Sequence, residues 1–106
     1  MSNNTQILKG ILEGCVLSII SKEITYGYEL LIKLKNYGFN DMVEGTLYPL
    51  LLRLEKNNLI TSEKRKSENG MTRKYFYLTE VGRKELQDFE TYWDKLCIDV
   101  NKILKE

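Results

Sequence analysis

Apolar residues recur every three to four positions through the first fifth of the chain, and this spacing predicts a helix from about Thr5 to Ser21. The apolar stripe is wide, so we expect this helix to be largely buried. A second helix is predicted from Tyr26 to about Tyr37, with Thr25 as its N-cap and Gly38 as the residue that ends it. The inner stripe of the second helix is expected to comprise Tyr28, Leu31 and Leu34.

A third helix is predicted from about Gly45 to Lys56, and Asn57-Asn58 is expected to end it because asparagine tolerates the left-handed conformation. Pro49 lacks an N–H group, so we expect it in or close to the first turn. The residues spaced for burial are Leu47, Leu50, Leu51, Leu54 and, past the helix end, Leu59. The opposite face carries Thr46, Tyr48, Pro49, Leu52, Arg53 and Lys56.

After the third helix the pattern changes to stretches rich in β-branched and aromatic residues. Two antiparallel strands are predicted, from Leu59 to Lys64 and from Thr72 to Leu78. The connecting segment from Arg65 to Met71 contains Asn-Gly, a strong turn motif, and is predicted to form a long basic tip. Thr79 is then expected to cap a final helix from Glu80 to about Leu104.

The final helix carries a narrow apolar seam of the kind found in coiled coils. Its members are spaced by three and four residues in alternation and are Leu86, Phe89, Trp93, Leu96, Val100 and Ile103. One long helix at the end of a small domain cannot bury such a seam along its full length, so a second copy of the chain is the simplest partner. We therefore predict that the seam is a homodimer interface, and packing back onto the first helix is the alternative.

The 106 residues suffice for one modest core and include neither histidine nor a glycine-rich phosphate-binding loop. These features argue against an enzyme, and we expect no metal or other cofactor. The polar beginning of the chain lacks the regions of a signal peptide, and no apolar run approaches the roughly 20 residues of a membrane span. A cytoplasmic location without membrane contact is therefore expected. Cys15 and Cys97 occupy apolar helical positions and are interpreted as small core residues.

Charge is distributed unevenly along the chain. The net charge is only +1, yet the segment from Arg53 to Lys74 holds seven basic and three acidic residues, and its net charge is +4. The rest of the chain is therefore at −3. A basic middle on a slightly acidic body is expected of a domain that presents one face to phosphates, although a solvated charged loop would look the same.

Three helices, a basic hairpin and a terminal helix, in this order, predict a mainly α-helical (α+β) winged helix-turn-helix. Residues 1–79 would form the DNA-binding domain and residues 80–106 the dimerisation helix, within one structural unit. The third helix would be the recognition helix, which enters the major groove, and the hairpin would be the wing. A protein-interaction module built on the same fold is the alternative, because winged helices can also bind proteins.

Candidate DNA contacts come from the second helix, the recognition helix and the wing. Thr46 and Tyr48 can bond to phosphates or base edges, and Arg53 can clamp a phosphate or a guanine. Strand alternation places one of Arg73 and Lys74 on the inner side of the hairpin. The full set of candidates is Tyr26, Thr46, Tyr48, Pro49, Arg53, Lys56, Lys64, Arg65, Lys66, Arg73 and Lys74.

The sequence also resembles the PadR family of bacterial transcriptional regulators, from about Ile7 to Leu104. The resemblance is carried by the segments Tyr26–Leu30, Gly45–Leu51, Arg53–Glu55, Leu59-Ile60 and Arg73–Gly82. The single terminal helix with its tryptophan resembles the compact subgroup of the family. Asn58 stands where the family more often has glycine, and Leu52 replaces a residue that is often polar.

The resemblance implies a homodimeric repressor that binds double-stranded operator DNA of two-fold symmetry. It also implies release from DNA by a small aromatic or drug-like effector, whose identity the sequence does not show. Trp93 lies in the middle of the seam, and two roles are open for it. Burial is the usual role of a large aromatic side chain, and the alternative is one wall of an effector pocket at the dimer interface.

Overall fold

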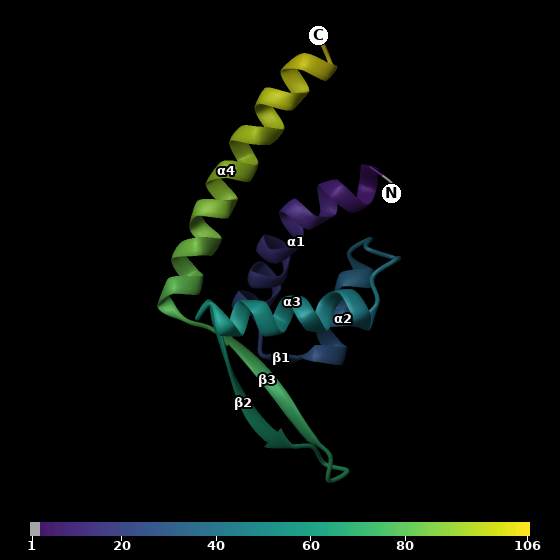
Figure 1. Cartoon of the computed structure of the whole chain (residues 1–106), viewed down its shortest axis with the longest axis vertical. Helices are drawn as coiled ribbons and strands as arrows, with labels where there is room; N and C mark the ends of the chain where they lie inside the picture. The colour runs from purple at the N-terminus through teal and green to yellow at the C-terminus, as the bar shows by residue number, and fades with distance from the viewer. Residues whose placement is uncertain (1–2) are drawn as a thin grey trace.

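A computed structural model describes residues 3–106 and shows a largely helical α+β fold (Figure 1), which confirms the predicted fold class. In chain order the elements are α1 (Asn3–Lys22), β1 (Thr25–Tyr26), α2 (Gly27–Asn36), α3 (Glu44–Lys56), β2 (Ile60–Lys66), β3 (Thr72–Leu78) and α4 (Glu80–Leu104). None of the helices in this described part is long and apolar enough to cross a membrane.

The core lies between α1, α2, α3 and the base of the hairpin. Val16, Leu34 and Leu54 are completely buried there, and Leu86 joins them from the first turns of α4. Of the predicted inner positions of α2 and α3, Leu59 is half-buried, Tyr28 is exposed and the others are buried. In the apolar stripe predicted for the first helix, Ile7 is exposed, and on α2 Leu30 is buried whereas Tyr28 is not.

Both α2 and α3 end in a Schellman motif, in which the residue after the C-cap adopts a left-handed conformation. Gly38 has φ +119° after α2, and Asn58 has φ 62° after α3. In the second case the Asn58 N–H donates to the Glu55 carbonyl and the Leu59 N–H to the Leu54 carbonyl, at 3.1 and 3.0 Å. The predicted ends of both helices are therefore confirmed.

The predicted starts of α2 and α3 need correction. Thr25 does not cap α2, because it is a buried residue of the short strand β1 and its hydroxyl donates to the Glu29 carboxylate at 2.8 Å. Extended Val43 precedes α3, so Gly45 lies inside the first turn. Pro49 is consequently the sixth helical residue, and the carbonyl of Gly45 has no helical N–H to accept.

The three strands form an antiparallel sheet in the order β1-β3-β2. Strand β1 was missed because two residues provide no periodicity, and it is revealed by the pairing of Thr25 with Phe76 and of Tyr26 with Tyr75. Strand β2 continues to Lys66, opposite Thr72. Arg65 and Lys66 therefore belong to the paired strand, and the tip is shorter than predicted.

The junction between the wing and α4 is compact. The Thr79 hydroxyl donates to the Asn58 carbonyl at 2.7 Å and accepts from the Gly82 N–H at 2.9 Å, which confirms Thr79 as the cap. The Thr79 N–H donates to the Leu59 carbonyl at 3.1 Å. A Cβ atom on Gly82 would overlap the same Leu59 oxygen, so only glycine permits this approach.

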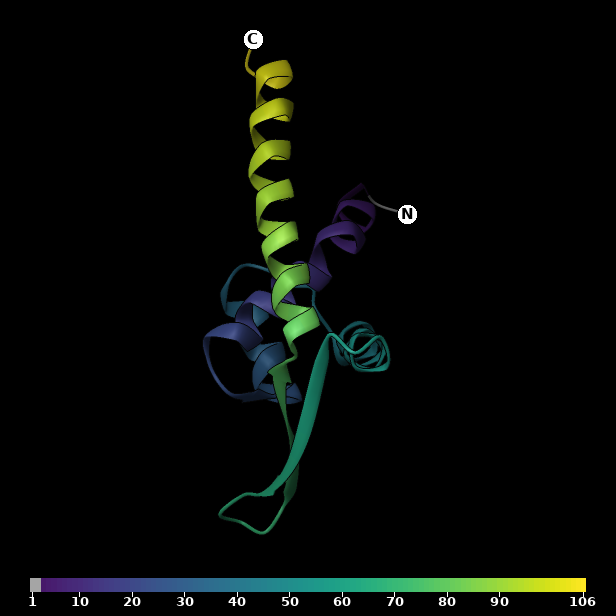
Figure 2. The same cartoon turned by 90° about the vertical axis from the view of Figure 1, so that its left-hand side faces the viewer.

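The molecule is elongated, with principal extents of 56 × 30 × 21 Å. The hairpin projects from one end and α4 from the other (Figures 1 and 2). The first turns of α4 pack against α1, whereas its C-terminal half extends beyond the body, and 76% of Ile103 is exposed.

Candidate nucleic-acid interface

The exposed surface of α3 has a central ridge and two flanks. Helical geometry places Gly45, Pro49, Leu52 and Lys56 along the ridge, directly opposite the buried leucines, and all four are exposed. Every α3 residue predicted to contact DNA is likewise solvent-exposed. Two of these predicted contacts, Pro49 and Lys56, lie on the ridge, and the other three are divided between the flanks.

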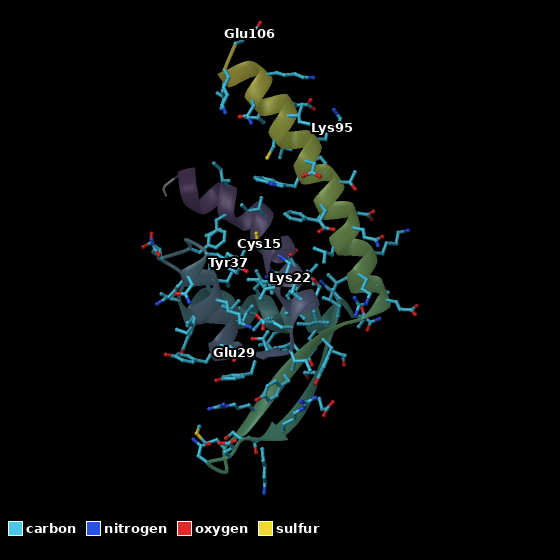
Figure 3. All side chains as sticks on the ribbon, turned by 180° about the vertical axis from the view of Figure 1, so that it is seen from behind. Cys15, Lys22, Glu29, Tyr37, Lys95 and Glu106 are labelled. Carbon is cyan, nitrogen blue, oxygen red and sulfur yellow. The ribbon has the colours of Figure 1, made fainter. Side chains whose placement is uncertain are left out.

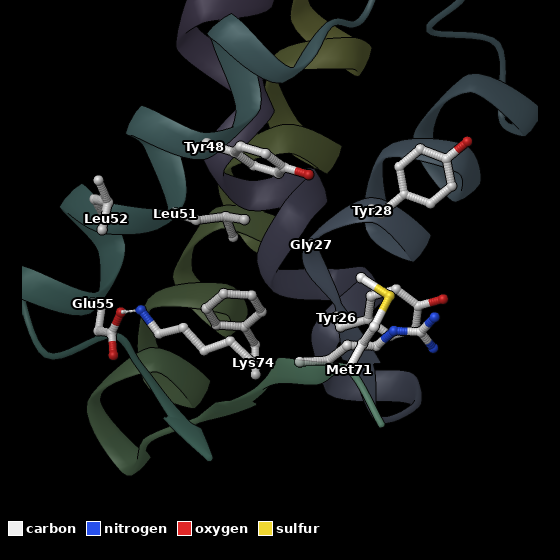
Figure 4. A pocket seen from close by; sticks show the side chains of 11 residues that line it. Tyr26, Gly27, Tyr28, Tyr48, Leu51, Leu52, Glu55, Met71 and Lys74 are labelled. Carbon is white, nitrogen blue, oxygen red and sulfur yellow. Dashed lines mark hydrogen bonds and ion pairs between the residues drawn. The ribbon is translucent and has the colours of Figure 1, made fainter. Parts of the chain in front are cut away.

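One flank faces the wing and carries Tyr48 and Glu55. A shallow pocket of about 530 Å³ lies between this flank, the start of α2 and the hairpin (Figure 4). The Tyr48 ring packs over Gly27, where an added Cβ would stand 3.0 Å from the ring. Partial burial, followed by the nearby Glu44 carboxylate, raises the pKa of Tyr48, so its hydroxyl stays protonated and can donate a hydrogen bond at neutral pH.

The other flank faces α1 and carries Thr46 and Arg53. The Arg53 Nε donates to the Glu13 carboxylate of α1 at 3.1 Å. Both side chains are roughly half exposed, and such surface pairs are weak. The Arg53 guanidinium is therefore available to a stronger anionic partner, and it does not share a flank with Tyr48.

On its inner face, the wing is attached to α3 by one carboxylate. Glu55 accepts from Ser62 of β2 at 2.7 Å and from the Lys74 ammonium of β3 at 2.8 Å. The Lys74 hydrogen bond, and next the Ser62 hydrogen bond, hold the pKa of the Glu55 carboxyl below its ordinary value. Among the predicted phosphate contacts, Lys74 is thus directed into the body of the protein (Figure 4).

On the outer face, arginine and tyrosine side chains stack on one another. The Arg73 guanidinium lies 4.4 Å from the centre of the Tyr26 ring, and Tyr26 meets Tyr75 edge to face at 5.5 Å. Arg65 lies over Tyr75 and also donates to the Tyr77 hydroxyl. These contacts hold the arginines in place while leaving donors free.

Lys64 and Lys66 differ from the arginines of the wing. Both are exposed, and neither forms an ion pair with any side chain that the structure describes. Lysine ammonium groups on mobile stems suit phosphate contacts that do not depend on geometry. The wing therefore combines two free cations with two arginines fixed by aromatic rings.

Four residues of this region were missed by sequence reasoning as site residues, namely Tyr28, Glu55, Met71 and Tyr75. Tyr28 was assigned to the core because it fits the helical spacing. The role of Glu55 depends on residues 7 and 19 positions away, and no local pattern could reveal these pairings.

A second region of interest lies between α1 and α4. Phe89 and Trp93 stack with a centroid distance of 6.4 Å, and Phe89 covers Gly14 of α1. A pocket of about 350 Å³ adjoins these rings, and Cys15, labelled in Figure 3, lines it. Cys15 and Cys97 are half-buried free thiols, not the core residues that were predicted, and burial raises the pKa of Cys15.

The members of the apolar seam lie in different surroundings. Leu86 belongs to the chain's own core, and Phe89 and Leu96 are half-buried. Trp93 is 38% exposed, and exposure increases further towards Ile103. The first turns of the seam thus pack within the chain, which was the alternative considered for it, whereas Val100 and Ile103 at its end are exposed.

A helix-turn-helix formed by α2 and α3, followed by a basic hairpin beside α3, defines a winged helix-turn-helix protein. Residues 16–88 match the model of the Transcriptional regulator PadR-like family. The chain belongs to this family, as its sequence motifs suggested.

Solved structures agree with this assignment. A PadR-like transcriptional regulator from Bacillus cereus is 46% identical, with 95% of this chain and 98% of that chain covered and a TM-score of 0.89. A Streptococcus transcriptional regulator is 47% identical over 92% of this chain and 96% of that chain, with a TM-score of 0.86. Bacillus subtilis PadR in complex with operator DNA is 25% identical over 74% of this chain and 46% of that chain, with a TM-score of 0.67.

The attachment of the wing through Glu55 can be tested with Glu55→Gln. We expect amide protection factors in β2 and β3 to fall about fivefold, on the order of 1 kcal/mol for solvent-screened, charge-assisted hydrogen bonds. Hydrogen–deuterium exchange at neutral pH measures this. Glu63→Gln is the control, because it removes an equal charge but breaks only the exposed contact with Arg65. Equal protection in the two variants would contradict the attachment.

The same contact predicts a dependence on pH. The pKa of Glu55 is lowered in the folded protein, so the stabilisation is present above the ordinary value of 4.5 and is lost as the pH falls through the lowered pKa. Wing protection in the wild type should therefore decrease below pH 4.5. Glu55→Gln should lack this component of the decrease.

Proposed function

We propose that this protein is a sequence-specific DNA-binding repressor that acts as a homodimer. The observation that carries the proposal is the arrangement of α3 beside a basic wing, with the exposed ridge of α3 and the free cations of the wing on adjoining surfaces. The ridge would enter the major groove, and the wing would contact the neighbouring phosphates. The operator complex of Bacillus subtilis PadR supports DNA as the partner.

The basic side chains have distinct roles in this proposal. Lys64 and Lys66 would contact phosphates from the wing, and Lys56 from the end of α3. Arg65 and Arg73, fixed by tyrosine rings, would present oriented donors to the DNA backbone. Arg53 would exchange Glu13 for a phosphate or a guanine, and Lys74 would serve mainly to position the wing.

A second copy of the chain would cover the exposed part of the seam. Trp93, Leu96, Val100 and Ile103 lie on one side of α4, and three of them are more than a third exposed. Pairing of two α4 helices would bury this apolar surface and fix two copies of α3 about 34 Å apart, the spacing of successive major-groove faces. A palindromic operator follows from such a two-fold dimer.

The effector pocket is the third part of the proposal. Trp93 stacks on Phe89 beside the pocket between α1 and α4, and its other face is open to the proposed dimer interface. A flat aromatic or drug-like compound could stack on this open face. It would release DNA if it bound better to a dimer whose recognition helices are wrongly spaced.

DNA binding itself is tested by titrating the protein with its own upstream region and with random duplex at several salt concentrations. The double variant Lys64→Gln/Lys66→Gln should weaken binding to both duplexes alike. The slope of log K against log salt should become shallower by about 0.9 for each lost phosphate contact. Lys74→Gln, the control, should leave the slope nearly unchanged because Glu55 occupies its ammonium group. A wild-type protein without preference for any duplex would refute the proposed function.

The dimer is tested with Leu96→Asp, which places a carboxylate in the middle of the exposed seam. Burying that charge in the dimer is unfavourable, so the variant should sediment as a monomer and lose at least tenfold in operator affinity, or about 1.4 kcal/mol. Asp94→Asn, on the exposed surface of the same helix, should remain dimeric and bind normally. A stable Leu96→Asp dimer would show that the seam is not the interface.

The effector role of Trp93 is tested with Trp93→Ala. In an operator-release assay over a panel of flat aromatic compounds, wild-type protein should be released by some of them, whereas the variant should need at least tenfold more. Dimerisation and operator binding by the variant, checked first by sedimentation and titration, should persist. Release of both proteins at equal concentrations would assign Trp93 to packing alone.

A further inference from the structure

The most exposed line of the recognition helix contains an apolar residue at its centre. Leu52 is 63% exposed, and helical geometry points it directly away from the buried leucines. A single exposed leucine is ordinary on a protein surface. Leu52, however, lies on α3, the helix proposed to enter the major groove, so it would face the edges of the bases.

The residues along this ridge offer few hydrogen-bonding groups. Gly45, Pro49 and Leu52 have no polar side-chain atoms, and the first donor on the ridge is the Lys56 ammonium at the end of α3. The polar side chains of α3 lie instead on the flanks. Bases opposite the middle of the ridge would therefore meet an apolar surface, which cannot distinguish them by hydrogen bonding.

An apolar surface in the major groove can still distinguish one base. Thymine carries a C5-methyl group there, and apolar side chains recognise it by van der Waals contact. Cytosine has only a hydrogen atom at C5 and presents its N4 donor beside it, and adenine and guanine present hydrogen-bonding atoms at their edges. Contact with any of these would desolvate polar atoms without replacing their hydrogen bonds.

The residues around Leu52 enlarge the apolar surface and restrict the kind of molecule that can bind to it. Leu52 borders the same pocket as Tyr48 and as Met71, the residue just before β3, and both are exposed (Figure 4). Lys56 lies one turn further along the ridge, and Lys64 and Lys66 follow on the wing. This cationic border suits a polyanion, which favours the edge of a DNA base over an apolar protein partner.

We propose that Leu52 is a specificity-determining residue that contacts the C5-methyl group of a thymine in each operator half-site. The inference rests on the proposed function, because it requires α3 to lie in the major groove. It identifies one base of each half-site as thymine and attributes the recognition of this base to contact with its methyl group.

The test removes apolar atoms from one side of the contact at a time, the C5-methyl group of thymine or the three outer carbons of Leu52. Each thymine of the bound operator is replaced in turn by deoxyuridine, which lacks only the C5-methyl group. For wild-type protein we expect one thymine per half-site at which the replacement weakens binding about fourfold, the effect of one methyl group removed from apolar contact. Leu52→Ala should bind the unmodified operator more weakly and show no further loss with deoxyuridine at that thymine.

Two comparisons separate this effect from general damage. Leu52→Ala should keep the circular dichroism spectrum and the random-DNA affinity of the wild type, because alanine favours helix and no charge is lost. Val81→Ala, at an exposed apolar residue at the start of α4, should retain the full deoxyuridine effect. The two variants thus remove similar apolar surface at different places.

The possible results bear separately on the methyl contact of Leu52 and on the proposed DNA-binding function. Equal affinity of wild-type protein for all the deoxyuridine operators would overturn the methyl contact while leaving the proposed function intact. An undiminished deoxyuridine effect in Leu52→Ala would show that another residue makes the contact. Absence of preferred binding to any duplex would refute the proposed function, and this inference with it.

Discussion

The arrangement of this protein depends on the junction at Leu59, Thr79 and Gly82. The Leu59 carbonyl accepts from the Thr79 N–H, and the Thr79 hydroxyl links the end of α3 to the first turn of α4. Because Gly82 has no Cβ, α4 can start against the backbone that leaves α3. The helix proposed for dimerisation is thereby fixed directly to the helix proposed to read DNA. A change in the angle of α4 would therefore act first on the backbone that leaves α3.

The contacts that the basic residues of the wing make within the protein divide these residues into three kinds. Glu55 holds both strands to α3 through Ser62 and Lys74, so one of the basic residues stabilises the wing. Tyrosine rings orient the arginines of the outer face. A positive net charge for the segment consequently overstates the number of phosphate contacts that it can make. Lys64 and Lys66 should therefore contribute to the salt dependence of binding, whereas Lys74 should not.

Local chemistry explains which features could be predicted from the sequence. The ends of α2 and α3, the cap at Thr79 and the strand from Thr72 to Leu78 depend on residues near each other in the chain, and all are confirmed. Strand β1 and the Glu55 contacts depend on distant partners, so periodicity could not reveal them. Tyr28 fits the inner spacing of α2 but lies on the pocket beside the wing. The candidate DNA contacts on α3 were correctly predicted as exposed, whereas the pairing of Arg53 with Glu13 required the orientation of α1.

The positions of the two pockets bear on how an effector could act. The pocket beside the wing lies on the proposed DNA surface, so a ligand there would compete with DNA directly. The pocket beside Phe89 and Trp93 lies between α1 and α4, on the other side of the junction at Gly82. A ligand in it would change DNA affinity only through its different affinities for two dimer geometries. Linkage then requires operator DNA to weaken that ligand's binding by the same finite factor, whereas direct competition at a shared surface weakens the apparent affinity without such a limit.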